Sequence, residues 1–187
     1  MNKLRLKNII WPMSMLLLIG CGSGEEKPDS PDRSIPEAQN ESITVGNTTT
    51  EQLGKTFVFA LQQDKYELIE QFLPSEDDFK DLLGLYDGTE EEKKEILAGS
   101  GQNSKKIKEN TALSFEEIKE EGVEAGIIWE EIKFGSTETV LNPENNVDYA
   151  EVTVLFSSNN LDYKIFLSEC INTSRGWLIF DQPKWLG

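Results

Sequence analysis

The sequence of 187 residues contains no histidine and only two cysteines, Cys21 and Cys170. Histidine is the commonest general base and the commonest metal ligand, so Ser-His pairs, Cys-His pairs and histidine metal sites are excluded. Two cysteines are too few for a disulfide framework or for a zinc site built on cysteine. We therefore expect no metal, no cofactor and no catalytic residue, and we expect that the protein is not an enzyme.

Basic residues are also scarce, with 18 Lys and Arg against 34 Asp and Glu and a net charge of −16. A surface this acidic repels phosphate backbones and anionic lipid headgroups, so we expect no nucleic acid binding and no electrostatic docking on a membrane. Acidic clusters at residues 76–78 and 90–92 suggest calcium at first sight. However, no EF-hand loop pattern is present, and both clusters fall in expected first helical turns, where the helix dipole favours acids.

No apolar run is long enough to cross a membrane. Lys3, Arg5 and Lys7 precede a mostly apolar run at residues 9–19. These 11 residues fall short of the roughly 20 that a spanning helix needs. A positive start followed by a short apolar run is typical of a signal peptide, which we assign to residues 1–20.

The apolar run ends in Leu18-Ile19-Gly20-Cys21, which resembles the lipobox of bacterial lipoproteins. The resemblance implies that a diacylglyceryl group is attached to the Cys21 thiol and that the chain is cleaved before Cys21. Two or three acyl chains make a stable anchor, because each buried CH₂ contributes about 0.8 kcal/mol. An incidental cysteine near an ordinary cleavage site is the alternative.

The lipobox resemblance implies a location in a bacterial cell envelope, with a membrane as the partner through the lipid anchor. Gly22, not Asp, follows Cys21, which implies the outer membrane rather than the inner one if the source has both. Residues 21–47 are polar and contain Pro28, Pro31 and Pro36. This composition predicts a disordered acidic tether, which leaves residues 48–187 as the folded domain.

The first half of this domain has helical periodicity. Threonines at 48–50 provide N-cap candidates, and Leu53, Phe57, Ala60 and Leu61 then share one helical face. Shorter helices are expected up to residue 122. Their signals are a break at Asp64, a stop at Pro74, capping boxes at Ser75/Asp78 and Thr89/Glu92, a loop at 99–103 and a last short helix from Ser114 to Gly122.

The second half has the period of two that is typical of strands. Strands are expected around residues 128–134, up to Leu141, over 150–157, over 161–171 and over 177–180, with turns between them. Helices followed by consecutive antiparallel strands predict an α+β fold, with N-terminal helices packed on one face of a curved antiparallel sheet.

Four segments, at residues 57–66, 149–154, 164–167 and 175–181, together resemble the NTF2-like (cystatin-like) cone of small bacterial lipoproteins. The resemblance implies a pocket between the helices and the concave sheet. It departs from the family pattern where Lys65 separates Asp64 from Tyr66, and where residues 89–122 form a longer insertion than the compact pattern requires.

Aromatic side chains are the candidates for lining such a pocket. We name Tyr66, Trp129, Tyr149 and Tyr163 as pocket candidates, with simple core packing as the alternative for each. Cys170 is expected to be a buried, unreactive thiol, because no histidine is present to lower its pKa.

Three functions remain open at this stage. The first is a non-enzymatic accessory module of the cell envelope that binds a small ligand or an envelope protein. The second, implied by the resemblance, is a small pocket enzyme of the ketosteroid isomerase or dehydratase type. The third is a module that dimerises through its open sheet face. The sequence is compatible with both a monomer and a dimer.

Overall fold

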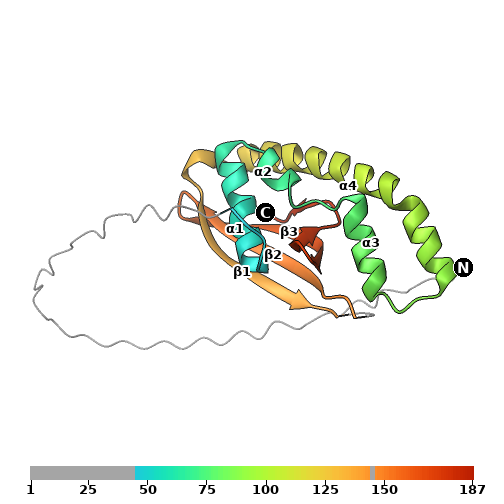
Figure 1. Ribbon diagram of the computed structural model, residues 1–187. Coiled ribbons are helices and arrows are strands. Elements are labelled where there is room, and N and C mark those ends of the chain that lie inside the picture. Colours follow the sequence, from blue (N-terminus) through green and yellow to red (C-terminus); the bar gives the residue numbers. More distant parts are fainter. Residues whose placement is uncertain (1–44, 144–145) are drawn as a thin grey trace, which may run out of the picture. The chain divides into compact units, whose positions relative to one another are not determined.

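The computed structural model describes residues 45–143 and 146–187, with helices first and strands after them (Figure 1). The signal peptide, the lipobox with Cys21 and the tether as far as residue 44 lie outside the described residues, as do two residues of the predicted turn after Leu141. The predicted α+β class is confirmed. The helices are α1 (Thr50–Gln63), α2 (Glu67–Glu70), α3 (Glu76–Leu85) and α4 (Glu90–Glu124).

A short 3-10 helix, η1 (Trp129–Glu131), leads into one antiparallel sheet. The sheet is curved and unclosed, with β1 at one edge, and β4 and β5 both pair with the long strand β3 at the other. Its strands are β1 (Lys133–Leu141), β2 (Tyr149–Ser158), β3 (Leu161–Thr173), β4 (Gly176–Ile179) and β5 (Lys184–Trp185).

The predicted alternation in β2 is confirmed, because Ala150, Val152, Val154 and Phe156 are at most 2% exposed. Helix α1 packs against β1 and β2 (Figure 1). Gly54 permits this close approach, since a Cβ there would collide with the β1 side chain of Thr137. The sheet therefore has one face that is buried under helices and one face that is more open.

Helix α1 follows its sequence prediction closely. The Thr49 side chain caps it by accepting a hydrogen bond from Gln52 N. The predicted face is completely buried, and the helix ends where Asp64 takes a left-handed conformation with φ 54°. The Asp64 carboxylate pairs with Lys119, so the end of α1 is also linked to α4.

The predicted capping boxes of α3 and α4 are both present. In α3, the Asp78 carboxylate accepts hydrogen bonds from Ser75 N at 2.7 Å and from Ser75 Oγ at 2.6 Å. The same oxygen accepts from Arg175 Nη1 at 2.6 Å. Arg175 lies in the turn between β3 and β4, so one buried carboxylate joins the start of α3 to the sheet.

The predicted loop at residues 99–103 is wrong, because α4 runs without a break from Glu90 to Glu124. At 1.5 Å per residue this helix is about 52 Å long. Glycine and serine lower helix propensity, but tertiary packing overrides such preferences. Ser100 and Ser104 are buried, and Ser104 Oγ donates to Pro74 O at 2.6 Å. Small residues here allow α4 to lie close to the start of α3.

The buried face of α4 also holds an unsatisfied hydroxyl. Across the two described ranges, Thr111 Oγ1 is the one buried side-chain oxygen or nitrogen without a hydrogen-bond partner. A buried donor without a partner costs about 1–3 kcal/mol. We predict that Thr111→Val raises the free energy of unfolding by about 1 kcal/mol in urea denaturation, because valine keeps the branched shape and removes the hydroxyl.

Thr56 provides the matched control, because it is equally buried but its hydroxyl is satisfied. Thr56 Oγ1 accepts from Gly46 N at 3.0 Å, and its single hydroxyl hydrogen has two carbonyl acceptors within reach, Gly46 O and Gln52 O, each at 2.9 Å. Thr56→Val should therefore destabilise the protein, although the chemical change is identical. A loss of stability in both valine variants would show that the Thr111 hydroxyl is satisfied.

A strand over residues 128–134 was also predicted, and this is wrong for its first part. Residues 129–131 form η1, and β1 starts only at Lys133. Trp129 turns inward because its Nε1 donates to Lys119 O at 3.1 Å and its ring stacks on Phe156. The contacts of the Trp129 side chain with distant residues therefore stabilise a 3-10 turn where the sequence pattern predicted a strand.

Three residues that we assigned to the tether, 45–47, pack against the folded domain. The Asn47 side chain is 8% exposed and donates to Arg175 O at 2.9 Å and to Trp177 O at 3.0 Å. The sequence offered no sign of this, because a single asparagine carries no periodicity.

Candidate functional site

Two of the four predicted pocket residues, Trp129 and Tyr163, lie in the core. Each is 7% exposed, and each stacks against Phe156, at centroid distances of 6.0 and 5.8 Å. Tyr163 also stacks on Trp185, and its hydroxyl donates to Ala125 O at 3.3 Å. These rings fill the space between helices and sheet. Trp129 and Tyr163 are therefore core residues and do not line an open pocket.

Tyr66 also packs inside the helical layer. Its ring meets Phe115 edge to face at 5.6 Å, and its hydroxyl donates to Lys108 O at 3.0 Å. Burial, and then the nearby Glu70 charge, raise the pKa of Tyr66 to about 12. The phenol therefore stays protonated at neutral pH and is held by a backbone carbonyl, which does not suit it to act as a catalytic acid.

Tyr149 lies apart from these three residues, beside a small concavity of about 260 Å³. There, Ser168 Oγ donates to Asp181 Oδ2 at 2.6 Å. Partial burial, and then the Asp181 charge, raise the pKa of the Glu169 carboxyl. The residue keeps enough contact with water for the solvent to screen these effects. The concavity is lined by Asn142, Tyr149, Ala150, Glu151, Ser168, Glu169 and Asp181.

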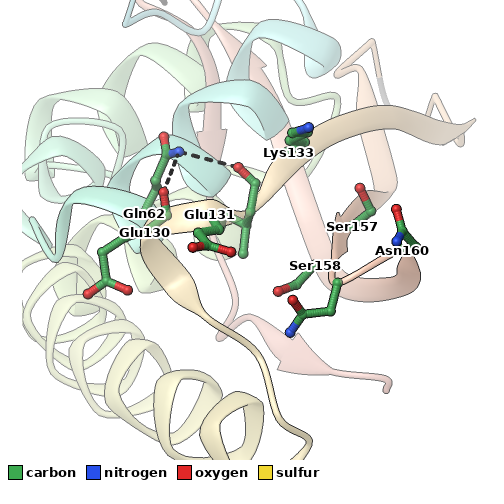
Figure 2. A pocket seen from close by; sticks show the side chains of 9 residues that line it. Gln62, Glu130, Glu131, Lys133, Ser157, Ser158 and Asn160 are labelled. Atoms are coloured by element: carbon green, nitrogen blue, oxygen red, sulfur yellow. Dashed lines mark hydrogen bonds between the residues drawn. The ribbon is translucent and has the colours of Figure 1, made fainter.

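A larger concavity, of about 470 Å³, lies where the end of α1, η1 and the β2–β3 hairpin meet (Figure 2). Glu130 and Glu131 stand on one side of it, and Ser157, Ser158 and Asn160 stand on the opposite side (Figure 2). We call it the hairpin concavity. Its lining is Gln62, Glu130, Glu131, Ile132, Lys133, Ser157, Ser158, Asn159 and Asn160.

Several polar groups of the hairpin concavity already serve the fold. Gln62 Nε2 donates to the carbonyls of Glu130 and Ile132, both at 3.3 Å. Ser158 Oγ accepts from a backbone amide, and Asn159 Nδ2 donates to a carbonyl. In the part of the chain that the structure describes, no hydrogen bond or ion pair involves the side chains of Glu130 or Glu131. The side chains of Lys133, Ser157 and Asn160 likewise make no hydrogen bond or ion pair among the described residues, so acidic, basic and neutral groups of the lining are all available to a ligand.

The structure also describes the surroundings of Cys170 and the arrangement of the acidic side chains. Cys170 is completely buried, as predicted, and burial followed by the Glu169 charge raises the pKa of its thiol. Within residues 45–143 and 146–187, no cluster of three acidic or cysteine side chains is arranged to hold a metal ion. No helix in these ranges combines the length and apolarity that a membrane span requires.

The sequence did not identify the lining of the hairpin concavity. Residues 158–160 were predicted as a hairpin turn, and this is confirmed by left-handed φ values of 53° and 61° at Asn159 and Asn160. Nothing in the pattern placed that turn next to η1 or Gln62. Comparisons with protein-family models, with curated proteins and with solved structures find no match for this chain.

Proposed function

We propose that this protein is a lipid-anchored accessory module of a bacterial cell envelope, which binds a polar ligand or a protein segment and performs no catalysis. The anchor would be Cys21 and the tether would follow it. The folded domain would be an NTF2-like cone. Its element order supports this proposal, because helices precede a curved antiparallel sheet, and α1 and β4 carry two of the segments on which the family resemblance rests.

The proposal that the protein performs no catalysis rests on the space between the helices and the sheet, which is filled by side chains. A ketosteroid isomerase or dehydratase type of enzyme needs an apolar pocket with a carboxylate that faces an acid. Here the corresponding space is filled by buried side chains, among them Phe57, Phe115 and Phe156. The hydroxyls of Tyr66 and Tyr163 donate to backbone carbonyls. The larger of the two concavities described above lies at the hairpin end, and its lining is mostly polar.

Lipid attachment is tested by mass. When the full-length chain is produced in a bacterial host, we expect the wild type to lose residues 1–20 and to gain the mass of two or three acyl chains. Cys21→Ala should carry no lipid and should leave the membrane fraction, because the acidic domain has little affinity for anionic headgroups. An unmodified wild-type mass at Cys21 would contradict the anchor.

The binding role is tested by occupancy. Native mass spectrometry of the lipid-free Cys21→Ala mature chain should reveal a co-purified or added polar ligand. Chemical-shift changes in the protein amides should then fall at the hairpin concavity. Turnover of an enolisable ketone that requires Tyr66 would contradict the non-enzymatic assignment.

A further inference from the structure

The hairpin concavity has an apolar neighbour. Ile128 N donates to Ser158 Oγ at 3.2 Å, and Ser158 is paired with Leu161 in the β2–β3 register. Ile128 is 43% exposed and Leu161 is 60% exposed. The backbones of Ile128 and Leu161 therefore lie beside the turn whose other residues line the concavity, and both side chains are exposed to water.

The charges around this turn are mainly negative. Glu130 and Glu131 both line the concavity from η1, although the Glu130 carboxylate points away from Ser157, Ser158 and Asn160 on the opposite side (Figure 2), and Asp162 directly follows Leu161. Lys133 is the single cation of the lining. The spare carboxylates therefore favour a cationic group, and the whole chain, at −16, repels an anionic partner.

We propose that this surface, which we call the hairpin-end surface (Ile128, Glu130, Glu131 and Leu161), docks a partner protein segment in which a lysine or arginine stands beside a large apolar residue. The inference rests on the proposed binding function and names its partner class. The cationic head would enter the hairpin concavity and lie against the carboxylates on its η1 side. The apolar neighbour would cover Ile128 and Leu161.

Charge complementarity selects this occupant over a second copy of the chain. Two copies would bring acidic surfaces together, and like charges at an interface are unfavourable. Each exposed ion pair contributes little in water, so the apolar contact should supply much of the affinity, and the carboxylates should supply selectivity and salt dependence.

The test uses the Cys21→Ala mature chain and an acetylated, amidated hexapeptide of alternating lysine and leucine. We expect saturable shifts of the backbone amides at residues 128–133 and 157–161 in two-dimensional NMR, which weaken as salt increases. A peptide of alternating glutamate and leucine should produce no shifts. A peptide of alternating lysine and serine should bind about tenfold more weakly, because it lacks the apolar part.

Paired variants separate the site from general attraction to an acidic protein. Glu130→Gln with Glu131→Gln should weaken peptide binding about fivefold. Glu116→Gln with Glu117→Gln removes the same charge from an exposed face of α4 and should leave binding unchanged. Equal weakening in both double variants, or shifts at other amides, would overturn the inference. If a neutral sugar shifts these amides and the peptide does not, the inference fails while the proposed binding function stands.

Discussion

Asp78→Ala is expected to lower the free energy of unfolding by about 3 kcal/mol. The Asp78 carboxylate is 2% exposed, and it satisfies Ser75 N, Ser75 Oγ and Arg175 Nη1. Alanine removes the capping box of α3 and the ion pair to the β3–β4 turn in one step. Arg175 is less damaged, because it is partly exposed and its Nη2 still donates to Gln71 O at 2.5 Å. Guanidinium chloride titration followed by circular dichroism measures the loss.

The neighbouring residue Asp77 is the matched control. Its side chain is 87% exposed, and among the described residues it pairs only with Lys80, one helical turn away. Asp77→Ala should therefore cost much less than Asp78→Ala, because an exposed pair contributes little and a charge in the first helical turn adds at most about 1 kcal/mol. If the two alanine variants unfold at the same denaturant concentration, the buried carboxylate does not hold α3 to the sheet.

Gly122→Ala is expected to lower the free energy of unfolding by about 2 kcal/mol, although alanine is the better helix former. A Cβ at residue 122 would lie 3.0 Å from Cε2 and Cη2 of Trp129 and closer still to Cζ2. The indole cannot easily move away. Its Nε1 donates to Lys119 O, and its ring stacks on Phe156. The overlap must therefore shift α4 or the indole ring.

Gly99, in the same helix, is the control for this substitution. A Cβ there would meet only Asn103 Nδ2, at an ordinary 3.5 Å. Gly99→Ala should stabilise the protein by about 0.5–1 kcal/mol, through helix propensity alone. Trp129→Phe should reduce the cost of Gly122→Ala, because the smaller ring leaves room for the methyl group. Equal stability of the two alanine variants would show that the Gly122 contact is not tight.

The contact between Gly122 and Trp129 also bears on function. Trp129 begins η1, and the next two residues are Glu130 and Glu131. The contact between the indole and α4 therefore also fixes the position of η1. The two glutamates of η1 are among the residues that line the hairpin concavity. We therefore expect that Gly122→Ala disturbs ligand binding as well as stability, whereas Gly99→Ala leaves binding intact.

Local patterns in the sequence predicted much of the fold. The face of α1, its end at Asp64, both capping boxes and the alternation of β2 are as predicted. These features depend on residues that are neighbours in the chain, such as a serine three residues before an aspartate. Periodicity and capping chemistry act over such short spans, so one sequence was enough to predict them.

Contacts between distant segments decided the rest. The glycines and the serine at residues 99–101 predicted a loop, but Ser100 and Ser104 are buried and Ser104 donates to Pro74 O, so the helix stays continuous. Trp129 was expected in a strand, but Lys119 and Phe156 hold it in a turn. The hairpin concavity joins Gln62, η1 and the β2–β3 turn, which are far apart in sequence. Burial and hydrogen bonding between segments outweigh local preference at these places, and only the tertiary structure brings those partners together.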